Sequence, residues 1–596
     1  MENESARPIM IFDGNCGFCG IWIDYWKRLT GDSILYEPYQ DAAGRFPNIP
    51  RENFQGAVHL ILPDGAVLSG ARAVFRSLAD VPDYAWMLWA QNKIPGFEAA
   101  SERLYRIIAR HRSLAYHVTT FLWGKRIEPP SFHIASHRFL QALGFIYLMA
   151  FLSLEMQITG LIGARGVLPV GPFLQAVGES LGAAAWLRVP TIFWFGSSDL
   201  ILKLACIAGS ITSFAITLNI GRRIALAVAW MLYLSLVTAG QSFLSFQWDF
   251  LLLEAGFLAV FLKPCFARVW LFRWLLFRLL FLSGAVKLLS GDPAWRNLTA
   301  LQYHYETQPL PTPLAWYFHQ MPAGFQKASA VVVFFVELVV PFLMFAPRRV
   351  RFFAGAMTVA LQTLIFITGN YAFFNLLTVA LCLFLFDDAV LRRFERREPK
   401  PVAAPTRFQR AVTAALFLVI LLAGCFQLQE TLSNTMPAPA ASVLSLLSPF
   451  GIVNTYGLFA VMTTARPEII VEGSNDGQTW LEYRFRYKPG DLQRVPAWVQ
   501  PHQPRLDWQA WFAALGDPQQ RRWFENFLAR LLQGSPEVLA LLAGNPFPEK
   551  PPRYVRALLY DYQFTNSTER KATGNWWKRE LKGTYFRPAS LAAAQP

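Results

Sequence analysis

The chain has 596 residues, of which 54% are hydrophobic and 16% are charged, whereas soluble domains carry about 25% charged residues. This composition argues against a wholly soluble protein, and the length allows about three or four domains. The formal net charge of +15 is typical of basic cytoplasmic loops in a membrane protein, so we expect no nucleic-acid partner.

The first 130 residues are predicted to form a small α/β domain. The apolar segment Ile9–Phe12 is typical of a strand and leads into a Cys-x-x-Cys motif at Cys16 and Cys19. Next come a helical pattern at residues 21–29, a strand at 34–36, a hairpin of 58–62 and 66–68, and a helix at 71–78. This order of elements is that of a thioredoxin-like fold. The polar N-terminus shows no signal peptide, so we expect this domain to be cytoplasmic.

The two paired cysteines predict thiol–disulfide chemistry. At a helix N-terminus, the helix dipole and the free backbone N–H groups stabilise a thiolate, so Cys16 is the expected nucleophile and Cys19 the resolving thiol. Asp13 would tune the pair or relay protons. The alternatives are half of a zinc site or two inert thiols. Because the sequence has no second Cys pair at ligand spacing, we expect no metal.

Long apolar runs occupy the middle of the chain, residues 131–430. A transmembrane helix needs about 20 mostly apolar residues. We predict about nine spans, which form a polytopic α-helical membrane bundle. They lie at residues 139–158, 193–219, 224–240, 246–263, 267–289, 327–346, 351–369, 371–386 and 409–428.

The charges of the connecting segments predict how the chain crosses the membrane. With a cytoplasmic N-terminal domain, nine spans place every dense basic cluster between spans on the cytoplasmic side, as the positive-inside rule requires. These clusters lie at residues 222–223, 263–268, 348–351 and 392–397. The last domain, residues 431–596, then lies on the outside.

Five polar residues in or beside the spans are candidates for a site in the bundle. Glu254, Lys287 and Glu337 lie in apolar segments, where charges are costly and often functional. Alternatively, Lys287 pairs with Glu254 or another carboxylate and only holds helices together. His304 and Glu306 lie in an aromatic outer segment. They are candidates for proton transfer, or they only anchor that segment.

Residues 431–596 are predicted to form a mixed domain with a β core. The expected elements are strands at 468–473, 480–487 and 557–564, an Asp-Gly turn after the first of them, and helices at 508–514 and 519–532. The last cysteine of the chain is Cys425, so this domain cannot hold an internal disulfide.

The segment Asp13-Gly14-Asn15-Cys16-Gly17-Phe18-Cys19 resembles the signature of the DCC family of thiol–disulfide oxidoreductase-like proteins. Leu62-Pro63-Asp64-Gly65 and the following Gly70-Ala71-Arg72-Ala73 are also similar to that family. The resemblance covers about residues 7 to 125. One departure from thioredoxins is that no proline lies just before the strand at Val58, where those proteins place a cis-proline beside the active site.

From about residue 135 to 590 the chain resembles the lipase maturation factor family. The similar stretches are Gly163–Pro169, Phe246–Asp249, Leu282–Asp292, Tyr303–Pro309, Pro504–Gln509, Asn545–Phe547, Tyr562–Phe564 and Gly574–Trp577. The resemblance implies a membrane protein that helps secreted lipases to fold and assemble, with its C-terminal domain in the lumen. Family members are typical of the endoplasmic reticulum membrane. For a bacterial chain with a fused redox domain, the equivalent is the inner membrane.

We therefore expect a three-part membrane maturation factor for secreted or envelope proteins, lipases among them, with a thiol–disulfide exchange component. Its expected partners are membrane lipid, client proteins and an unidentified redox partner, and we expect no cofactor. Two alternatives stay open. One is a membrane enzyme that resembles vitamin-K-dependent carboxylases distantly and uses Glu254, Lys287 and His304. The other is a non-enzymatic chaperone.

Overall fold

The computed structural model of the chain describes residues 7–82, 84–261, 266–394, 406–516 and 522–591. The chain forms two compact units. The first comprises residues 1–131, 345–353 and 387–389, and the second comprises residues 132–344, 354–386 and 390–596. Parts of two predicted basic clusters, residues 263–265 and 395–397, lie outside the described residues.

The first unit contains a four-stranded sheet in the order β2-β1-β3-β4. Its strands are β1 (Ile9–Phe12), β2 (Leu35–Pro38), β3 (His59–Ile61) and β4 (Val67–Ser69). Strand β1 runs parallel to β2 and antiparallel to β3, and β3 and β4 form an antiparallel hairpin. The predicted strands and hairpin are confirmed.

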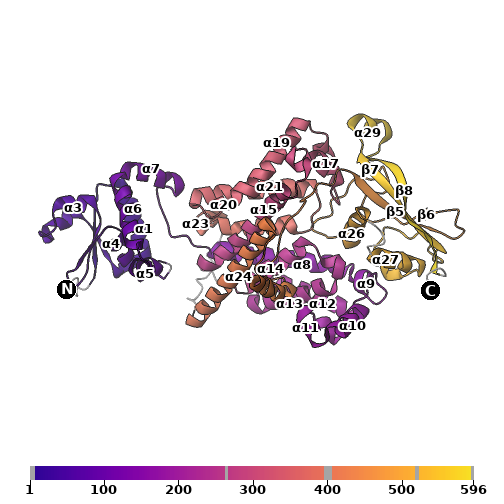
Figure 1. Ribbon diagram of the computed structural model, residues 1–596, viewed down its shortest axis with the longest axis horizontal. Helices are drawn as coiled ribbons and strands as arrows, with labels where there is room; N and C mark the ends of the chain where they lie inside the picture. The colour runs from indigo at the N-terminus through magenta and orange to yellow at the C-terminus, as the bar shows by residue number, and fades with distance from the viewer. Residues whose placement is uncertain (1–6, 83, 262–265, 395–405, 517–521, 592–596) are drawn as a thin grey trace. The chain divides into compact units, whose positions relative to one another are not determined.

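Side chains alternate along β1 and build two apolar layers. Met10 and Phe12 pack with Ile23 of α1 (Gly17–Thr30). Ile11 packs on the opposite face with Phe54 of α3 (Arg51–Gly56). Figure 1 shows α1, α4 (Gly70–Ser77) and α6 (Phe97–Arg110) on one side of this sheet and α3 on the other. This is the predicted thioredoxin-like α/β arrangement, to which α5 (Ala85–Lys93) and α7 (Arg112–Leu122) are added.

The second unit contains most of the apolar helices. Among the described residues, seven helical segments are long and apolar enough to cross a membrane. They are α8 (His133–Glu155), α12 (Asp199–Thr217), α13 (Arg222–Ala239), α15 (Phe266–Leu289), α19–α20 (Ala323–Leu343, with a π-helical turn at Phe335–Val339), α21 (Arg348–Thr368) and α24 (Arg407–Ser433). An eighth crossing would be the helix pair Phe374–Leu385 and Asp388–Phe394, which is bent by 108°.

The prediction of about nine spans therefore exceeds the seven or eight found among the described residues. The predicted span at 246–263 corresponds to α14 (Gln247–Val260), a helix of only 14 residues. Ten of its residues are buried, on all sides of the helix. A helix that is apolar all round and enclosed by protein has the composition of a span, but α14 is shorter than the about 20 residues that a helix exposed to lipid needs to cross a membrane.

The C-terminal part forms an antiparallel sheet in the order β6-β5-β7-β8. Its strands are β5 (Arg466–Ser474), β6 (Leu481–Glu482), β7 (Tyr554–Phe564) and β8 (Trp577–Ala589). Helices α26 (Arg505–Ala514) and α27 (Arg522–Leu532) lie beside this sheet (Figure 1). The β core is confirmed. The predicted strand at 480–487 is only two residues long, β8 was not predicted, and residues 519–521 of a predicted helix lie outside the described residues.

Candidate functional site

The dithiol lies where β1 passes into α1. Cys16 is the N-cap residue of α1, and its Sγ accepts a hydrogen bond from the backbone N–H of Cys19 at 3.2 Å. The Cys19 thiol donates to Cys16 Sγ, 2.6 Å away. The predicted position of the pair at a helix N-terminus is thus found. There, backbone N–H groups and the helix dipole favour negative charge on the first sulfur.

The two thiols have different surroundings. Burial, followed by the hydrogen bond to Cys16, raises the pKa of Cys19 to about 12. Cys19 therefore stays protonated at neutral pH and donates to its neighbour. This suits a resolving thiol, which must wait until Cys16 has formed a mixed disulfide before it is deprotonated and attacks.

Asp13 lies in the turn before the dithiol and is held by three groups. Its Oδ1 accepts hydrogen bonds from Asn15 N and Gln40 Nε2, both at 3.1 Å. Its Oδ2 lies 3.5 Å from Nη1 of Arg112. Asp13 disfavours a thiolate at Cys19, and Arg112 favours one. Sequence patterns did not reveal Arg112, because 99 positions separate it from Asp13 and it lies in no motif.

An apolar cavity of about 590 Å³ lies beside the dithiol. Cys19 and Asp13 line it together with Phe18, Trp22 and Trp26 of α1 and with apolar side chains of α6 and α7. The wall from α6 and α7 was not recognised in the sequence. Of the two thiols, Cys19 lines this cavity.

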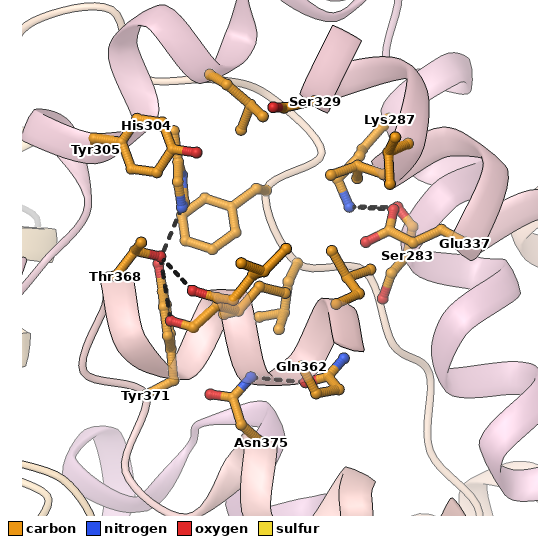
Figure 2. A pocket seen from close by; sticks show the side chains of 18 of the residues that line it. Ser283, Lys287, His304, Tyr305, Ser329, Glu337, Gln362, Thr368, Tyr371 and Asn375 are labelled. Atoms are coloured by element: carbon orange, nitrogen blue, oxygen red, sulfur yellow. Dashed lines mark hydrogen bonds and ion pairs between the residues drawn. The ribbon is translucent and has the colours of Figure 1, made fainter. Parts of the chain in front are cut away.

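A second cavity, of about 540 Å³, lies within the helical bundle. Figure 2 shows polar groups at three places around it: Lys287 with Glu337, His304 with Tyr371, and Gln362 with Asn375. The other lining side chains are mostly apolar, and more than half of them come from α15, α19 and α21. The structure thus brings together three of the predicted residues, which are Lys287, Glu337 and His304.

Lys287 and Glu337 form a buried ion pair across two helices. Lys287 Nζ donates to Glu337 Oε2 at 2.7 Å and to Ser283 O at 3.0 Å, and it lies 5.3 Å from the ring centroid of Trp295. Glu337 lies in the π-helical turn before Pro341, and such turns are frequent at functional sites. Gly284 permits the close approach, since a Cβ there would lie 2.9 Å from Glu337 Cβ.

His304 lies on α17 (Ala300–Thr307), with its Nε2 3.4 Å from Tyr371 Oη. Burial, with a smaller contribution from Lys287, lowers the pKa of His304 to about 4, so the imidazole is neutral at physiological pH. Glu306 does not line the cavity. Its carboxylate accepts from Phe564 N at 3.0 Å and lies 3.6 Å from His319 Nε2, which ties α17 to β7.

Glu254 is also outside the cavity lining. It pairs with Arg278, which is fully buried, and accepts hydrogen bonds from Asn454 at 3.1 Å and Tyr456 at 2.8 Å. Of the two partners suggested for Lys287, the structure shows another carboxylate, Glu337, and not Glu254. No sequence signal pointed to Arg278 as the partner of Glu254, because Arg278 lies in an apolar segment predicted as a span.

Within the described ranges, no group of three or more His, Cys, Asp or Glu side chains is placed to hold a metal ion. The first site offers two thiols, one at a helix N-terminus and one buried beside it. The second site offers hydrogen-bonding groups and one neutralised ion pair inside an apolar cavity.

Three domain families, two of them from lipase maturation factors, match the chain in order. Residues 10–117 match the DCC1-like thiol-disulfide oxidoreductase family, residues 134–393 the lipase maturation factor transmembrane domain, and residues 452–587 the lipase maturation factor C-terminal domain. No solved structure matches the chain.

Whole proteins are similar over about three quarters of the chain. Lipase maturation factor 2 of Gallus gallus is 38% identical in an alignment of length 579. The alignment covers 76% of this chain and 81% of that protein. Lipase maturation factor 1 of Mus musculus is 36% identical in an alignment of length 515, which covers 78% of this chain and 89% of that protein. Lipase maturation factor 2 of Homo sapiens is 36% identical in an alignment of length 585, which covers 76% of this chain and 82% of that protein.

Proposed function

This chain belongs to the lipase maturation factor family, and on that premise we propose that it helps secreted or envelope hydrolases of the lipase class to mature at a membrane. The observation that carries this proposal is the run of similarity through both the helical bundle and the C-terminal sheet. The DCC1-like match to residues 10–117 and the Cys16–Cys19 geometry support an added thiol–disulfide exchange step.

The proposed exchange uses both sulfurs. The Cys16 thiolate attacks one sulfur of a partner disulfide, forms a mixed disulfide and releases the partner's other sulfur as a thiolate. Cys19, once deprotonated, then attacks Cys16 Sγ and releases the second partner thiolate. The partner gains two electrons, and Cys16–Cys19 becomes a disulfide. A dithiol reductant, the unidentified redox partner, returns the pair to its starting state.

The proposed topology keeps residues 1–130 in the cytoplasm and residues 431–596 on the outer or lumenal face, joined by residues 131–430. The membrane is the bacterial inner membrane, or that of the endoplasmic reticulum in a eukaryote. This arrangement puts every dense basic cluster inside. For nine crossings, the short and enclosed helix α14 must cross the membrane, and so must the bent helix pair at residues 374–394. The dithiol then meets a cytoplasmic disulfide and regulates client maturation on the other face.

Compartment-specific labelling tests this topology. The background is the chain in which Cys265 and the three described thiols that are not buried, Cys16, Cys19 and Cys425, are replaced by serine. The vesicles are sealed and expose the outer face of the membrane to the reagent. Gln478→Cys, at an exposed position of the C-terminal domain, should then react with a membrane-impermeant maleimide. Asp64→Cys, at an exposed turn of the first domain, should react only after the vesicles are opened. Labelling of both positions from the same side would overturn the proposed topology and would favour an even number of crossings.

Secretion of an active lipase tests the function. We expect a host that lacks its own maturation factor to secrete active lipase when it receives this chain. If the exchange step regulates maturation, a host that receives the double variant with Cys16→Ser and Cys19→Ser should secrete less active lipase. Cys425→Ser, which removes an exposed lone thiol, is the matched control. No gain in lipase activity from the wild-type chain would contradict the maturation role. An unchanged yield from the double variant would contradict only the exchange step.

The geometry favours this function over an enzyme centred in the bundle. That alternative combines Glu254, Lys287 and His304, and Glu254 does not line the cavity that the other two share. Glu254 is instead enclosed by Arg278, Asn454 and Tyr456.

A further inference from the structure

The bundle cavity opens through an apolar rim on two helices that can cross a membrane. Phe325 and Val332 of α19 line the cavity and are each 44% exposed, and Leu364 of α21 is 47% exposed. Ala328, between the first two on α19, lines it and is exposed as well. Exposed apolar side chains on such helices contact lipid chains. A ligand can therefore enter this cavity sideways from the bilayer.

The inner wall offers hydrogen bonds but no free charge. The only ionic groups of the described lining, Lys287 and Glu337, neutralise each other, and His304 is neutral. A charged head group would lose its hydration here without gaining an opposite charge. The cavity therefore favours an uncharged polar group.

One buried acceptor in this wall has no partner. Asn375 is 1% exposed, and its Nδ2 donates to Gln362 Oε1 at 2.6 Å. Its Oδ1 receives no hydrogen bond from any described residue. A buried acceptor without a donor is costly, and a ligand hydroxyl would satisfy it. The cavity volume of about 540 Å³ is within the roughly 300–1,000 Å³ of small-molecule sites, which suits one aliphatic chain.

We propose that this cavity binds an uncharged single-chain lipid with a hydroxyl-bearing head group, of the monoacylglycerol type. The head lies among Asn375, Gln362 and Tyr371, and a hydroxyl donates to Asn375 Oδ1. The aliphatic chain follows the apolar wall toward the rim at Phe325 and Val332. This site goes beyond the maturation role and does not depend on the Cys16–Cys19 pair.

The test uses the full chain in phosphatidylcholine nanodiscs. The probe is a monoacylglycerol with a photoreactive diazirine at the end of its oleoyl-length chain, and the comparison probe is the fatty acid of the same chain. After irradiation, mass spectrometry identifies the labelled peptides. We expect the monoacylglycerol probe to label the cavity segments of α19 and α21, unlabelled monooleoylglycerol to compete, and the fatty acid to label them much less.

Two variants sharpen the result. Asn375→Leu removes the acceptor at similar size and should reduce specific labelling about fivefold, the effect of one hydrogen bond. Ala328→Phe fills the opening and should abolish specific labelling. Ile211→Phe, on the exposed face of α12, is the control for added bulk toward lipid and should not change it.

The proposal is overturned if the fatty acid labels the cavity as well as the monoacylglycerol does, because the site would then accept an anion. It is also overturned if labelling is spread over lipid-facing helices and resists competition. Both comparisons use the wild-type chain, so they hold even where a variant fails to fold.

Discussion

Arg505 of α26 binds Asp249 of α14 with two hydrogen bonds, from Nη1 to Oδ2 at 2.9 Å and from Nη2 to Oδ1 at 2.8 Å. Both side chains are buried. Tyr233 donates to the same carboxylate at 2.5 Å. This paired geometry is the strongest form of an arginine–carboxylate contact, and it fastens the C-terminal domain to a helix enclosed in the bundle.

Breaking this pair should strongly destabilise the second unit. Arg505→Leu leaves Asp249 buried without its counter-ion, which costs about 3–5 kcal/mol. Arg505→Lys keeps the positive charge but cannot make both hydrogen bonds to Asp249, so an intermediate decrease in stability is expected. Thermal unfolding of the purified protein in detergent measures both. The control Arg165→Ala breaks an ion pair with Glu537 in which the arginine is 61% exposed, and it should change little. Equal effects of Arg505→Leu and the control would contradict the prediction.

The ion pair of Lys287 and Glu337 should behave as a coupled unit. Either Lys287→Met or Glu337→Leu alone strands one buried charge and should cost about 3–5 kcal/mol. The double variant removes both charges and should recover most of that loss, because a buried pair is roughly equivalent to apolar residues of similar size. Additive losses in thermal unfolding would show that the two side chains act independently.

Cys19 should be a slow nucleophile. With its pKa raised to about 12, against about 8.5 for an ordinary thiol, its thiolate fraction at pH 8 is about a thousandfold lower. In Cys16→Ser, where burial remains the main cause, iodoacetamide should modify Cys19 at least about a hundredfold more slowly than it modifies glutathione. Mass spectrometry of the digested protein gives the rate. A rate close to that of glutathione would show that Cys19 is not enclosed as described.

His304 should make stability depend on acid pH. The folded protein holds its pKa at about 4, whereas an unfolded histidine has a pKa of about 6.5. Between these values the unfolded chain binds a proton that the folded chain does not, so stability falls as the pH drops through this range. The loss at pH 5 is about 2 kcal/mol. His304→Gln should make this part of the pH profile of thermal unfolding less steep. Burial also lowers the pKa of His502 to about 4, so part of the slope should remain. The exposed His117→Gln should leave the slope unchanged.

Local patterns were sufficient for the sheet of the first unit and for its helices α1 and α4, but not for α6 and α7. The continuous apolar run Ile9–Phe12 and the Pro63-Asp64-Gly65 turn indicate their structure within a few positions, so the strands and the hairpin were predicted. The position of Cys16 at a helix N-terminus followed from the same signals. Strand β8 was missed because its burial hardly alternates, with residues 578–582 all exposed.

Contacts between distant segments could not be predicted. Glu254 lies 24 positions from Arg278 and 202 from Tyr456, and no periodicity links them. The composition of α14 is that of a span, because apolar residues are required both by lipid and by a protein core. Only the fold shows which of the two surrounds it.

The pairing of α14 with the C-terminal domain has a consequence for biosynthesis. Arg505 follows Asp249 by 256 positions, and Asn454 follows Glu254 by 200. A ribosome must therefore complete most of the chain before these two bundle carboxylates meet all their partners. Until then Asp249 lacks its counter-ion and Glu254 has only Arg278. Full assembly thus waits for the last quarter of translation.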